Sequence, residues 1–433
     1  MLIDVFRGRF ILMRLLLLLA TGVLVGIGII TIYTIGHPTQ TTGSNISQAD
    51  SQYPDLTPKA SSTNKYSNKW QKQIAYVGAG LTCLVLVNLF DYRRLGPISY
   101  LLYGIILAML ALLLVDRIVH LPFVHERFGI RRWFKIGFGF MIQPSEFCKV
   151  IYILALAWYL RFRDNYRTFK GLVGPFALTL LAMVLILLEP DLGTTVLLMP
   201  ILFTMLFVAG AKVKHLVIIL CLGMAVSPII IRPYQRARIT SVLLQNETIF
   251  AAAKEHPRFG QLLMGPDYRI KLRNWASDDG LQLINSKRAI ASGGITGYGF
   301  GQGPYLQHRD YLNLPEADND MIFAMIAHQF GIGGCVAVLL AYITIVSCAI
   351  ELAWLNTEPF GRLVAAGIAA MFAVQGLVNV GMTLGLMPIT GLTLPLVSYG
   401  GSSMVVNLIA IGLLNNIGRH RPFTVAKKPF EFG

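Results

Sequence analysis

Long apolar runs recur along this chain and constrain its fold more than any other feature. They begin near Phe10, Ile74 and Pro97 and continue almost to the C-terminus, separated by polar connections. About 20 largely apolar residues are enough for a helix to cross a bilayer, and a single apolar segment satisfies its backbone there only as a helix. Charged residues make up only 14% of the chain, against about 25% in soluble domains. The sequence therefore predicts an all-α, polytopic integral membrane protein.

The apolar pattern predicts ten transmembrane helices in a single membrane domain. Seven fall within residues 10–231, the long polar segment 232–320 follows, and three more lie within 321–418, before a tail at 419–433. An amphipathic connection precedes the fourth span, and a polar, aperiodic segment follows the first, as in a flexible loop. The approximate spans are 10–35, 74–90, 97–115, 143–160, 171–188 and 192–209, a seventh that follows residues 211–214 and runs to 231, and then spans starting near 321, 362 and 394.

Basic residues set the expected orientation. The chain carries 37 lysines and arginines against 22 acidic residues, a net charge of +15. They cluster beside apolar segments, which favours lipid head groups over nucleic acid as their partner. Both termini and the basic connections at 93–94, 161–170 and 212–214 fall on one side, predicted to be the cytoplasm. The segments 37–69, 189–194 and 232–320 then face outward, where ATP is not available.

Asp320 is the leading candidate for chemistry. It lies at the end of the polar segment, directly before the apolar run that begins at Met321. One interpretation is a helix N-cap, because an aspartate accepts hydrogen bonds from free backbone N–H groups there. The other is a general base: partial burial at the membrane boundary raises the pKa of a carboxyl group while the helix end lowers it. Such a group can accept a proton from a substrate hydroxyl.

Four ionisable residues elsewhere have both a structural and a functional interpretation. Glu146 and Lys149 are three residues apart and share a helix face, which suits either an ion pair between helices or a substrate contact inside the membrane. Arg132, beside Trp133, is either an interfacial anchor or a ligand for a diphosphate. Arg236 allows the same two interpretations, anchoring or anion binding.

The last predicted loop contains the run SYGGSS. Irregular backbone at membrane depth occurs only where it is buried in protein or lines a cavity, and free N–H groups of such a turn can bind phosphate. A plain re-entrant turn is the alternative. The chain has no GxxxxGK[ST], HExxH or GxSxG motif, so it gives no support to P-loop, zincin or serine-hydrolase chemistry. The candidate phosphate-binding residues are Ser398, Gly400, Gly401 and Ser402.

Taken together, these segments resemble the SEDS family of bacterial membrane proteins, the RodA, FtsW and SpoVE group. The similarity runs from the first span to the last, with six motifs in the family's order. Within the family, SKRAIASGG favours the elongation type, RodA, although GYGFGQG followed by LPEAD shares features with the division type, FtsW. The motifs are RRWFKIGFGFMIQPSEFCK, EPDLGT, RPYQRARI, INSKRAIASGGITGYGFG, LPEADNDMIFA and GLMPITGLTLPLVSYGGSS.

The resemblance implies a peptidoglycan glycosyltransferase that polymerises lipid II outside the cytoplasmic membrane and works with a class B penicillin-binding transpeptidase. Asp320 matches the family's essential loop aspartate and would activate the acceptor hydroxyl, with undecaprenyl diphosphate leaving in an inverting displacement. Glu146, Lys149 and Arg132 match further family positions. A divalent cation, Mg²⁺ or Mn²⁺, can share the neutralisation of the leaving diphosphate, but the sequence shows no ligand set for one.

Several departures from the family pattern surround this aspartate. His328 and Gln329 replace two consecutive glutamates, Asp318-Asn319 replaces His-Thr, and residues 241–280 form a longer loop. Glu189 and Tyr298 replace a glutamine and a lysine in two other motifs. These changes motivate a non-catalytic scaffold for a transpeptidase as the first alternative. The intramembrane residues Glu146 and Lys149 motivate a transporter of lipid-linked precursor as the second.

Overall fold

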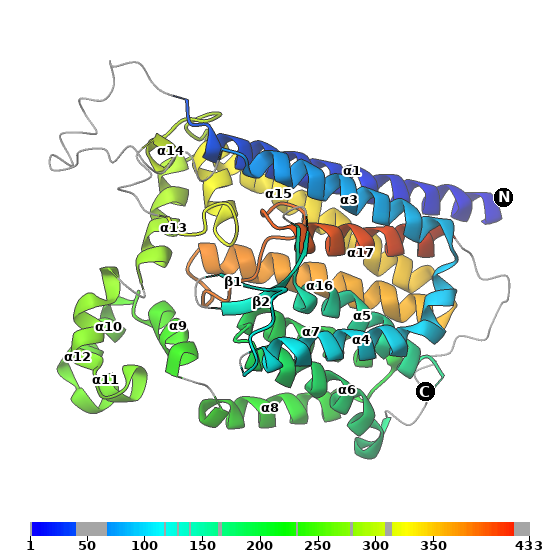
Figure 1. Cartoon of the computed structure of the whole chain (residues 1–433), viewed down its shortest axis with the longest axis horizontal. Helices are drawn as coiled ribbons and strands as arrows, with labels where there is room; N and C mark the ends of the chain where they lie inside the picture. The colour runs from blue at the N-terminus through cyan, green and yellow to red at the C-terminus, as the bar shows by residue number, and fades with distance from the viewer. Residues whose placement is uncertain are drawn as a thin grey trace.

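The structure, a computed structural model, describes residues 2–39, 67–116, 118–127, 130–137, 140–162, 167–230, 233–277, 280–307 and 314–419. Long helices lie alongside one another and form one bundle (Figure 1). They are α1 (Leu2–Gly36), α3 (Lys69–Leu89), α4 (Leu95–Val115), α5 (Pro144–Leu160), α6 (Phe169–Leu188), α7 (Leu192–Ala209), α8 (Val213–Ile230), α15 (Ile322–Leu355), α16 (Pro359–Thr383) and α17 (Gly401–Arg419), with a 3-10 turn, η2 (Tyr92–Arg94), before α4.

These helices confirm the prediction of an all-α polytopic membrane protein. Eight helices among the described residues are long and apolar enough to cross a membrane. The other two predicted spans correspond to α5, which has 17 residues, and to α8, whose shorter apolar part is Val213–Ala225. The interior of the bundle is built around α16 and α17, whose most apolar windows are 72% and 83% buried.

Two helices start elsewhere than the sequence predicted. Helix α3 begins at Lys69, the last residue of the predicted loop, rather than near residue 74. Helix α17 begins at Gly401 rather than near residue 394. Pro395 lacks a backbone N–H and Leu396 has a φ of 66°, so this stretch cannot continue a helix.

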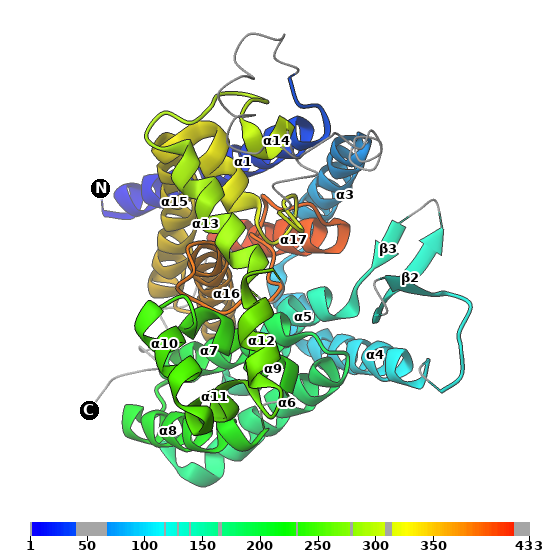
Figure 2. The same cartoon turned by 90° about the vertical axis from the view of Figure 1, so that its left-hand side faces the viewer.

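A small antiparallel sheet takes the place of the predicted amphipathic connection before α5. Its strands are β1 (Val124–Arg127), β2 (Ile130–Gly137) and β3 (Phe140–Ile142), in the order β1-β2-β3. Figure 2 shows β2 and β3 projecting beside the helix bundle. Arg131 in β2 pairs with the buried Asp116 at 3.1 Å, which ties the sheet to the end of α4. These strands were not predicted from the sequence.

The polar segment between α8 and α15 folds into short helices at one end of the bundle (Figures 1 and 2). Arg238 donates to the carbonyl of Ile389 at 2.9 Å, and Gln245 donates to that of Gly385 at 3.0 Å. Leu244, Ala253, Met264, Tyr268 and Leu272 form a separate small core. The elements are α9 (Pro233–Leu243), α10 (Glu247–Glu255), α11 (Pro257–Met264), α12 (Tyr268–Asn274), η4 (Trp275–Ser277), α13 (Leu281–Gly293) and α14 (Pro304–Gln307).

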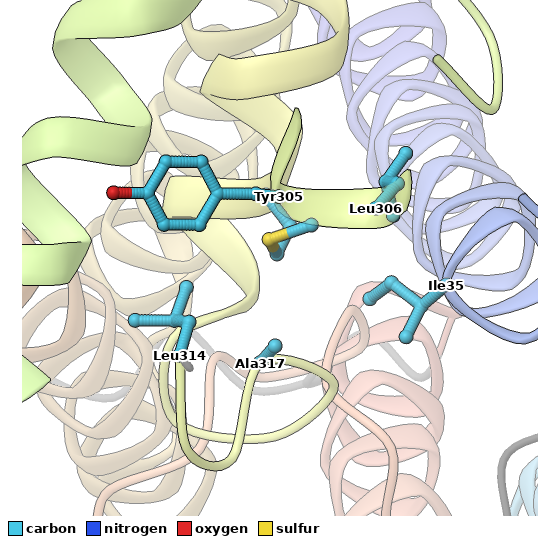
Figure 3. A pocket seen from close by; sticks show the side chains of 6 residues that line it. Ile35, Tyr305, Leu306, Leu314 and Ala317 are labelled. Atoms are coloured by element: carbon cyan, nitrogen blue, oxygen red, sulfur yellow. The ribbon is translucent and has the colours of Figure 1, made fainter. Parts of the chain in front are cut away.

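A second small apolar cluster fastens this segment to the bundle. Figure 3 shows the side chains of Ile35 from α1, Tyr305 and Leu306 from α14, and Leu314 and Ala317 around a shallow hollow. The hollow has no space as large as a water molecule. It therefore acts as packing that holds the stretch before α15 against α1, rather than as a binding pocket.

Helix α15 is broken at Gly331, which has φ 59° and ψ −152°. The break frees the carbonyls of His328 and Gln329, and these accept from the N–H groups of Tyr298 (3.1 Å) and Gly299 (2.9 Å). In return, the N–H of Ile332 donates to Ile295 at 3.1 Å. The glycine-rich loop after α13 thus replaces intrahelical hydrogen bonds of α15, and we call this arrangement the glycine clasp.

Replacing Gly331 with alanine should lower the melting temperature of the purified protein. Its backbone conformation is almost restricted to glycine, at a cost of about 1–3 kcal/mol for other residues. A Cβ there would also clash with the carbonyl of Ile295 and lie 2.5 Å from the nitrogen of Gly297. Gly333→Ala is the matched control, because a Cβ at Gly333 meets no atom within 4 Å. Equal melting temperatures for the two variants would contradict this account of the clasp.

Candidate functional site

A cavity of about 360 Å³ opens where several helices begin. Its walls come from the starts of α3, α5 and α17, from the sheet, and from the turn that precedes α15. The wall combines carboxylates, amides, hydroxyls and aromatic rings, so it offers a ligand both hydrogen-bonding groups and apolar surface. The lining residues are Lys69, Tyr76, His125, Trp133, Met141, Gln143, Glu146, Glu316, Asp318, Asn319, Thr393, Tyr399, Gly400, Gly401, Ser402 and Ser403.

Asp320 lies in the turn beside this cavity, directly after the lining residues Asp318 and Asn319. The turn is closed by the carbonyl of Glu316, which accepts from the N–H groups of Asn319 at 3.0 Å and Met321 at 3.1 Å. Glu316 itself has a φ of 52°, a strained conformation for a residue with a side chain, and such strain is concentrated at functional sites. The backbone therefore holds Asp320 in one defined place at the cavity edge.

The capping interpretation of Asp320 is wrong. Met321 occupies the N-cap position of α15, and no side chain caps that helix. Asn379 of α16 instead positions Asp320 through its backbone, since the Asn379 amide donates to the carbonyl of Asp320 at 2.9 Å and to that of Leu392 at 2.7 Å. The carboxylate atom Oδ1 of Asp320 is buried and has no hydrogen-bond partner among the described residues. This oxygen is thus a buried acceptor that no hydrogen bond in the described part of the fold satisfies.

The surroundings of Asp320 raise its pKa to about 7, chiefly through burial and then through the nearby carboxylate of Glu316. Arg238 acts in the opposite direction and lowers the pKa. Part of the residue surface nevertheless stays accessible. A carboxyl group that titrates near neutral pH is suited to accept a proton from a substrate hydroxyl, because the efficiency of a general base is greatest when its pKa is near the working pH.

Glu146 and Lys149 form an ion pair inside the bundle. Lys149 Nζ lies 2.7 Å from an oxygen of Glu146, and the exposed fractions of the two side chains are 0% and 9%. Glu146 lines the cavity, whereas Lys149 lies behind it, within the interior of the bundle. The pair joins two residues of α5, so the interpretation as an ion pair between helices is wrong. Glu146 faces the cavity, and its contact with a substrate stays a prediction.

The two candidate arginines lie away from the cavity wall. Arg132 donates to the backbone carbonyls of Glu189, at 2.7 Å, and of Pro190, so it anchors the turn between α6 and α7. Arg236 is exposed on α9. Its neighbour Arg238 is the residue that acts electrostatically on Asp320. The sequence therefore predicted the correct helix, α9, for a cation near Asp320, but it indicated Arg236 rather than Arg238.

The loop before α17 meets the cavity with Gly400, Gly401 and Ser402. Ser398 does not line it: its hydroxyl donates to the carbonyl of Asn319 at 2.6 Å and accepts from the N–H of Leu394 at 2.8 Å. Ser398 thus ties this loop to the turn that carries Asp320. The hydroxyl of Ser402 is bonded to the backbone of Gln143 at 2.9 Å. Both serines hold the wall together.

An ion pair that the sequence analysis missed also lies on the cavity wall. Lys69, in the first turn of α3, pairs with Asp318, and its Nζ lies 5.1 Å from the centre of the Tyr399 ring. The partners are 249 residues apart, so no local pattern joins them. The replacement of the family's histidine by Asp318 was the one available signal, and it gave no indication of Lys69.

The described residues do not assemble a metal site. No group of three or more His, Cys, Asp or Glu side chains in the ranges given above is arranged to hold an ion. Within these ranges, such side chains do not form a donor set for Mg²⁺ or Mn²⁺.

The fold and site define a class: a polytopic membrane protein with an acid-rich cavity at one end of its helix bundle. The family model "Cell cycle protein", for FtsW, RodA and SpoVE, matches residues 54–422. This chain belongs to that family.

Named relatives and solved structures agree. The chain is 32% identical to stage V sporulation protein E of Bacillus subtilis (strain 168) over 354 residues, which is 81% of this chain and 87% of that protein. It is 34% identical to FtsW of the same strain, with 84% of each chain covered. It is 30% identical to the peptidoglycan glycosyltransferase RodA of Treponema pallidum (strain Nichols), with 81% and 90% covered.

Two solved structures share the fold. One is a chain in a peptidoglycan synthase complex described as coordinating polymerization and crosslinking, with 28% identity, a TM-score of 0.64 and coverage of 93% and 96%. The other is the rod shape determining protein RodA of Thermus thermophilus, with 25% identity, a TM-score of 0.58 and coverage of 94% and 96%.

Proposed function

We propose that this chain, a peptidoglycan glycosyltransferase by its family, polymerises lipid II into glycan strands. In this proposal Asp320 is the general base. The carrying observation is the carboxylate of Asp320, whose pKa is raised to about 7 and which directly follows the lining residues Asp318 and Asn319 in the turn at the cavity. Related chains are named probable peptidoglycan glycosyltransferase FtsW and peptidoglycan glycosyltransferase RodA. In the proposal, the nucleophile that this base serves is therefore a sugar hydroxyl.

In the proposed reaction, the 4-hydroxyl of one lipid-linked disaccharide attacks the anomeric carbon of the other substrate's terminal sugar. The new glycosidic C–O bond forms as the bond from that carbon to the diphosphate breaks, with inversion. The hydroxyl proton passes to Asp320, and undecaprenyl diphosphate leaves with the electron pair. Charge develops on the leaving diphosphate, so a cation near it stabilises the transition state. Asn379 and Ser398 contribute by fixing the turn that carries Asp320.

The basic residues described above support a location in the bacterial cytoplasmic membrane, with both termini in the cytoplasm. The cavity and Asp320 then face outward, together with the short helices α9–α14. A class B penicillin-binding transpeptidase is the proposed partner, because a structurally similar chain belongs to a peptidoglycan synthase complex. The process served is cell elongation and shape determination, or division.

The test is a lipid II polymerisation assay with the purified full chain and a candidate transpeptidase. Wild type should form polymer, and Asp320→Asn should reduce the rate by about 100- to 10,000-fold, the usual contribution of a general base. Asp267→Asn, at an exposed aspartate of the same polar segment, should keep the wild-type rate. Polymer formation by Asp320→Asn at the wild-type rate would refute the proposal.

The same preparations separate the alternatives. If wild type forms no polymer but still co-purifies with the transpeptidase, a non-catalytic scaffold explains the chain better. If it moves lipid-linked precursor across reconstituted vesicles without polymerising it, the transporter is the better reading.

A further inference from the structure

Lys69 is the one lysine or arginine among the described residues that line the cavity. It belongs to the first turn of α3, which is directly preceded by the polar segment after α1. Its side chain is 16% exposed, whereas that of its ion-pair partner Asp318 is 4% exposed. The side chain of Lys69 thus lies at the wall of the cavity and is partly exposed, whereas that of Asp318 is more deeply buried.

The other cations near the site are engaged elsewhere. Lys149 is fully buried behind Glu146, Arg132 is bound to the carbonyls of Glu189 and Pro190, and Arg238 binds the carbonyl of Ile389. None of these three residues lines the cavity. Lys69 is therefore the lysine or arginine that the described wall of the cavity offers to a diphosphate.

The remaining charges of the wall are negative. Glu146, Glu316 and Asp318 all line the cavity, and a dianionic group is repelled by each of them unless a cation intervenes. The charge of Glu146 is compensated by its ion pair with Lys149, which is buried farther from the cavity. A lysine ammonium is a compact charge on a flexible stem with three donors, so Lys69 can turn from Asp318 to an incoming phosphate without movement of α3. Tyr399, 5.1 Å from Nζ, stabilises the ammonium in this position.

We propose that Lys69 binds the diphosphate of the lipid-linked substrate, and that Asp318 is the counter-ion that holds Lys69 in place while the cavity is empty. The proposal rests on the proposed function, because it assumes that the ligand is a lipid-linked diphosphate. It assigns Lys69 a direct role in stabilising the leaving group. Asp318 is a positioning residue that competes with the ligand for the same ammonium group.

The test is direct binding of undecaprenyl diphosphate to the full-length protein, with undecaprenol as the control ligand that lacks phosphate. Tryptophan fluorescence can follow binding, because Trp133 lines the cavity. Lys69→Ala should weaken diphosphate binding by about tenfold or more, the usual value of a charge-assisted hydrogen bond, and leave undecaprenol binding unchanged. Lys254→Ala, at an exposed lysine of α10, should bind both ligands as wild type does.

Asp318→Asn separates a ligand role from a purely structural ion pair. It should bind the diphosphate as tightly as wild type or more tightly, because it removes a competing carboxylate and leaves Lys69 available. The double variant Lys69→Ala/Asp318→Ala removes both charges of this pair and should still show the weakened binding, even if Lys69→Ala alone folds poorly. Equal losses in Lys69→Ala and Asp318→Asn, or no loss in the double variant, would overturn the proposal.

The outcome is independent of the proposed activity. Polymer formation without Lys69-dependent diphosphate binding would leave the glycosyltransferase standing and remove this inference. Lys69-dependent binding in a protein that forms no polymer would keep the inference about the ligand and remove the proposed reaction.

Discussion

The polymerisation rate at low lipid II concentration should rise about tenfold per pH unit below about pH 6 and level off above about pH 8. Asp320 acts as a base only in its deprotonated form, and burial together with Glu316 raises its pKa to about 7. Below that pH the protonated form dominates in the folded protein, so the active fraction falls as pH falls. The measurement is the pH dependence of kcat/KM, which reports the ionisation of the free enzyme.

Two substitutions should move this profile in opposite directions. Glu316→Gln removes a negative neighbour that raises the pKa of Asp320, so the rising limb should move to lower pH. Arg238→Gln removes a cation that lowers that pKa, so the limb should move to higher pH. If the rising limb of the pH profile stays at the same pH in both variants, the limb reports the ionisation of a group other than Asp320. This conclusion holds whatever the effect of the substitutions on the absolute rate.

Loss of either partner of the Glu146–Lys149 pair should destabilise the protein by about 3–5 kcal/mol, because it leaves an uncompensated charge in the interior. Lys149 is fully buried, and Glu146 is only 9% exposed at the cavity wall, so water replaces a lost partner poorly for either charge. Lys149→Met and Glu146→Gln should each lower the melting temperature of the detergent-solubilised protein, measured by thermal unfolding.

The double variant Glu146→Gln/Lys149→Met is the control, and it should be markedly more stable than Lys149→Met alone. Replacing both members of a buried ion pair with neutral side chains is often close to neutral. If the double variant is as unstable as the two single changes added together, the two charges do not stabilise each other, and the pair is not the reason for the loss. Polymerisation assays on the same variants separate stability from a contact of Glu146 with substrate.

Much of the fold could be read from the sequence, because the membrane imposes a simple rule on apolar runs. Helix α7 was predicted at residues 192–209 and spans Leu192–Ala209. The small sheet could not be read in this way, because β1 and β3 have only four and three residues. Strands that short show too few alternations to distinguish them from a loop. The late start of α17 depends on the local conformation around Leu396, which composition does not reveal.

The site was predictable in part. The motif positions pointed to Asp320 and Glu146, and the structure places both at or beside one cavity. Sequence alone could not show that Asn379 holds the backbone of Asp320, since the two residues are 59 positions apart. The environment of Arg132 was equally hidden, because its partners are backbone carbonyls. Contacts between distant residues, rather than residue types, decide which cation faces the cavity.

The glycine clasp has a consequence for how the chain enters the bilayer. An unbroken helix enters with its backbone hydrogen bonds complete, but the break at Gly331 leaves the carbonyls of His328 and Gln329 to be satisfied by the loop after α13. An unsatisfied carbonyl in hydrocarbon costs several kcal/mol. Helix α15 therefore cannot reach its native shape during insertion until a loop translated before it has docked. The start of α15, next to Asp320, therefore reaches its native conformation only when the helices pack together, after the transmembrane spans have formed.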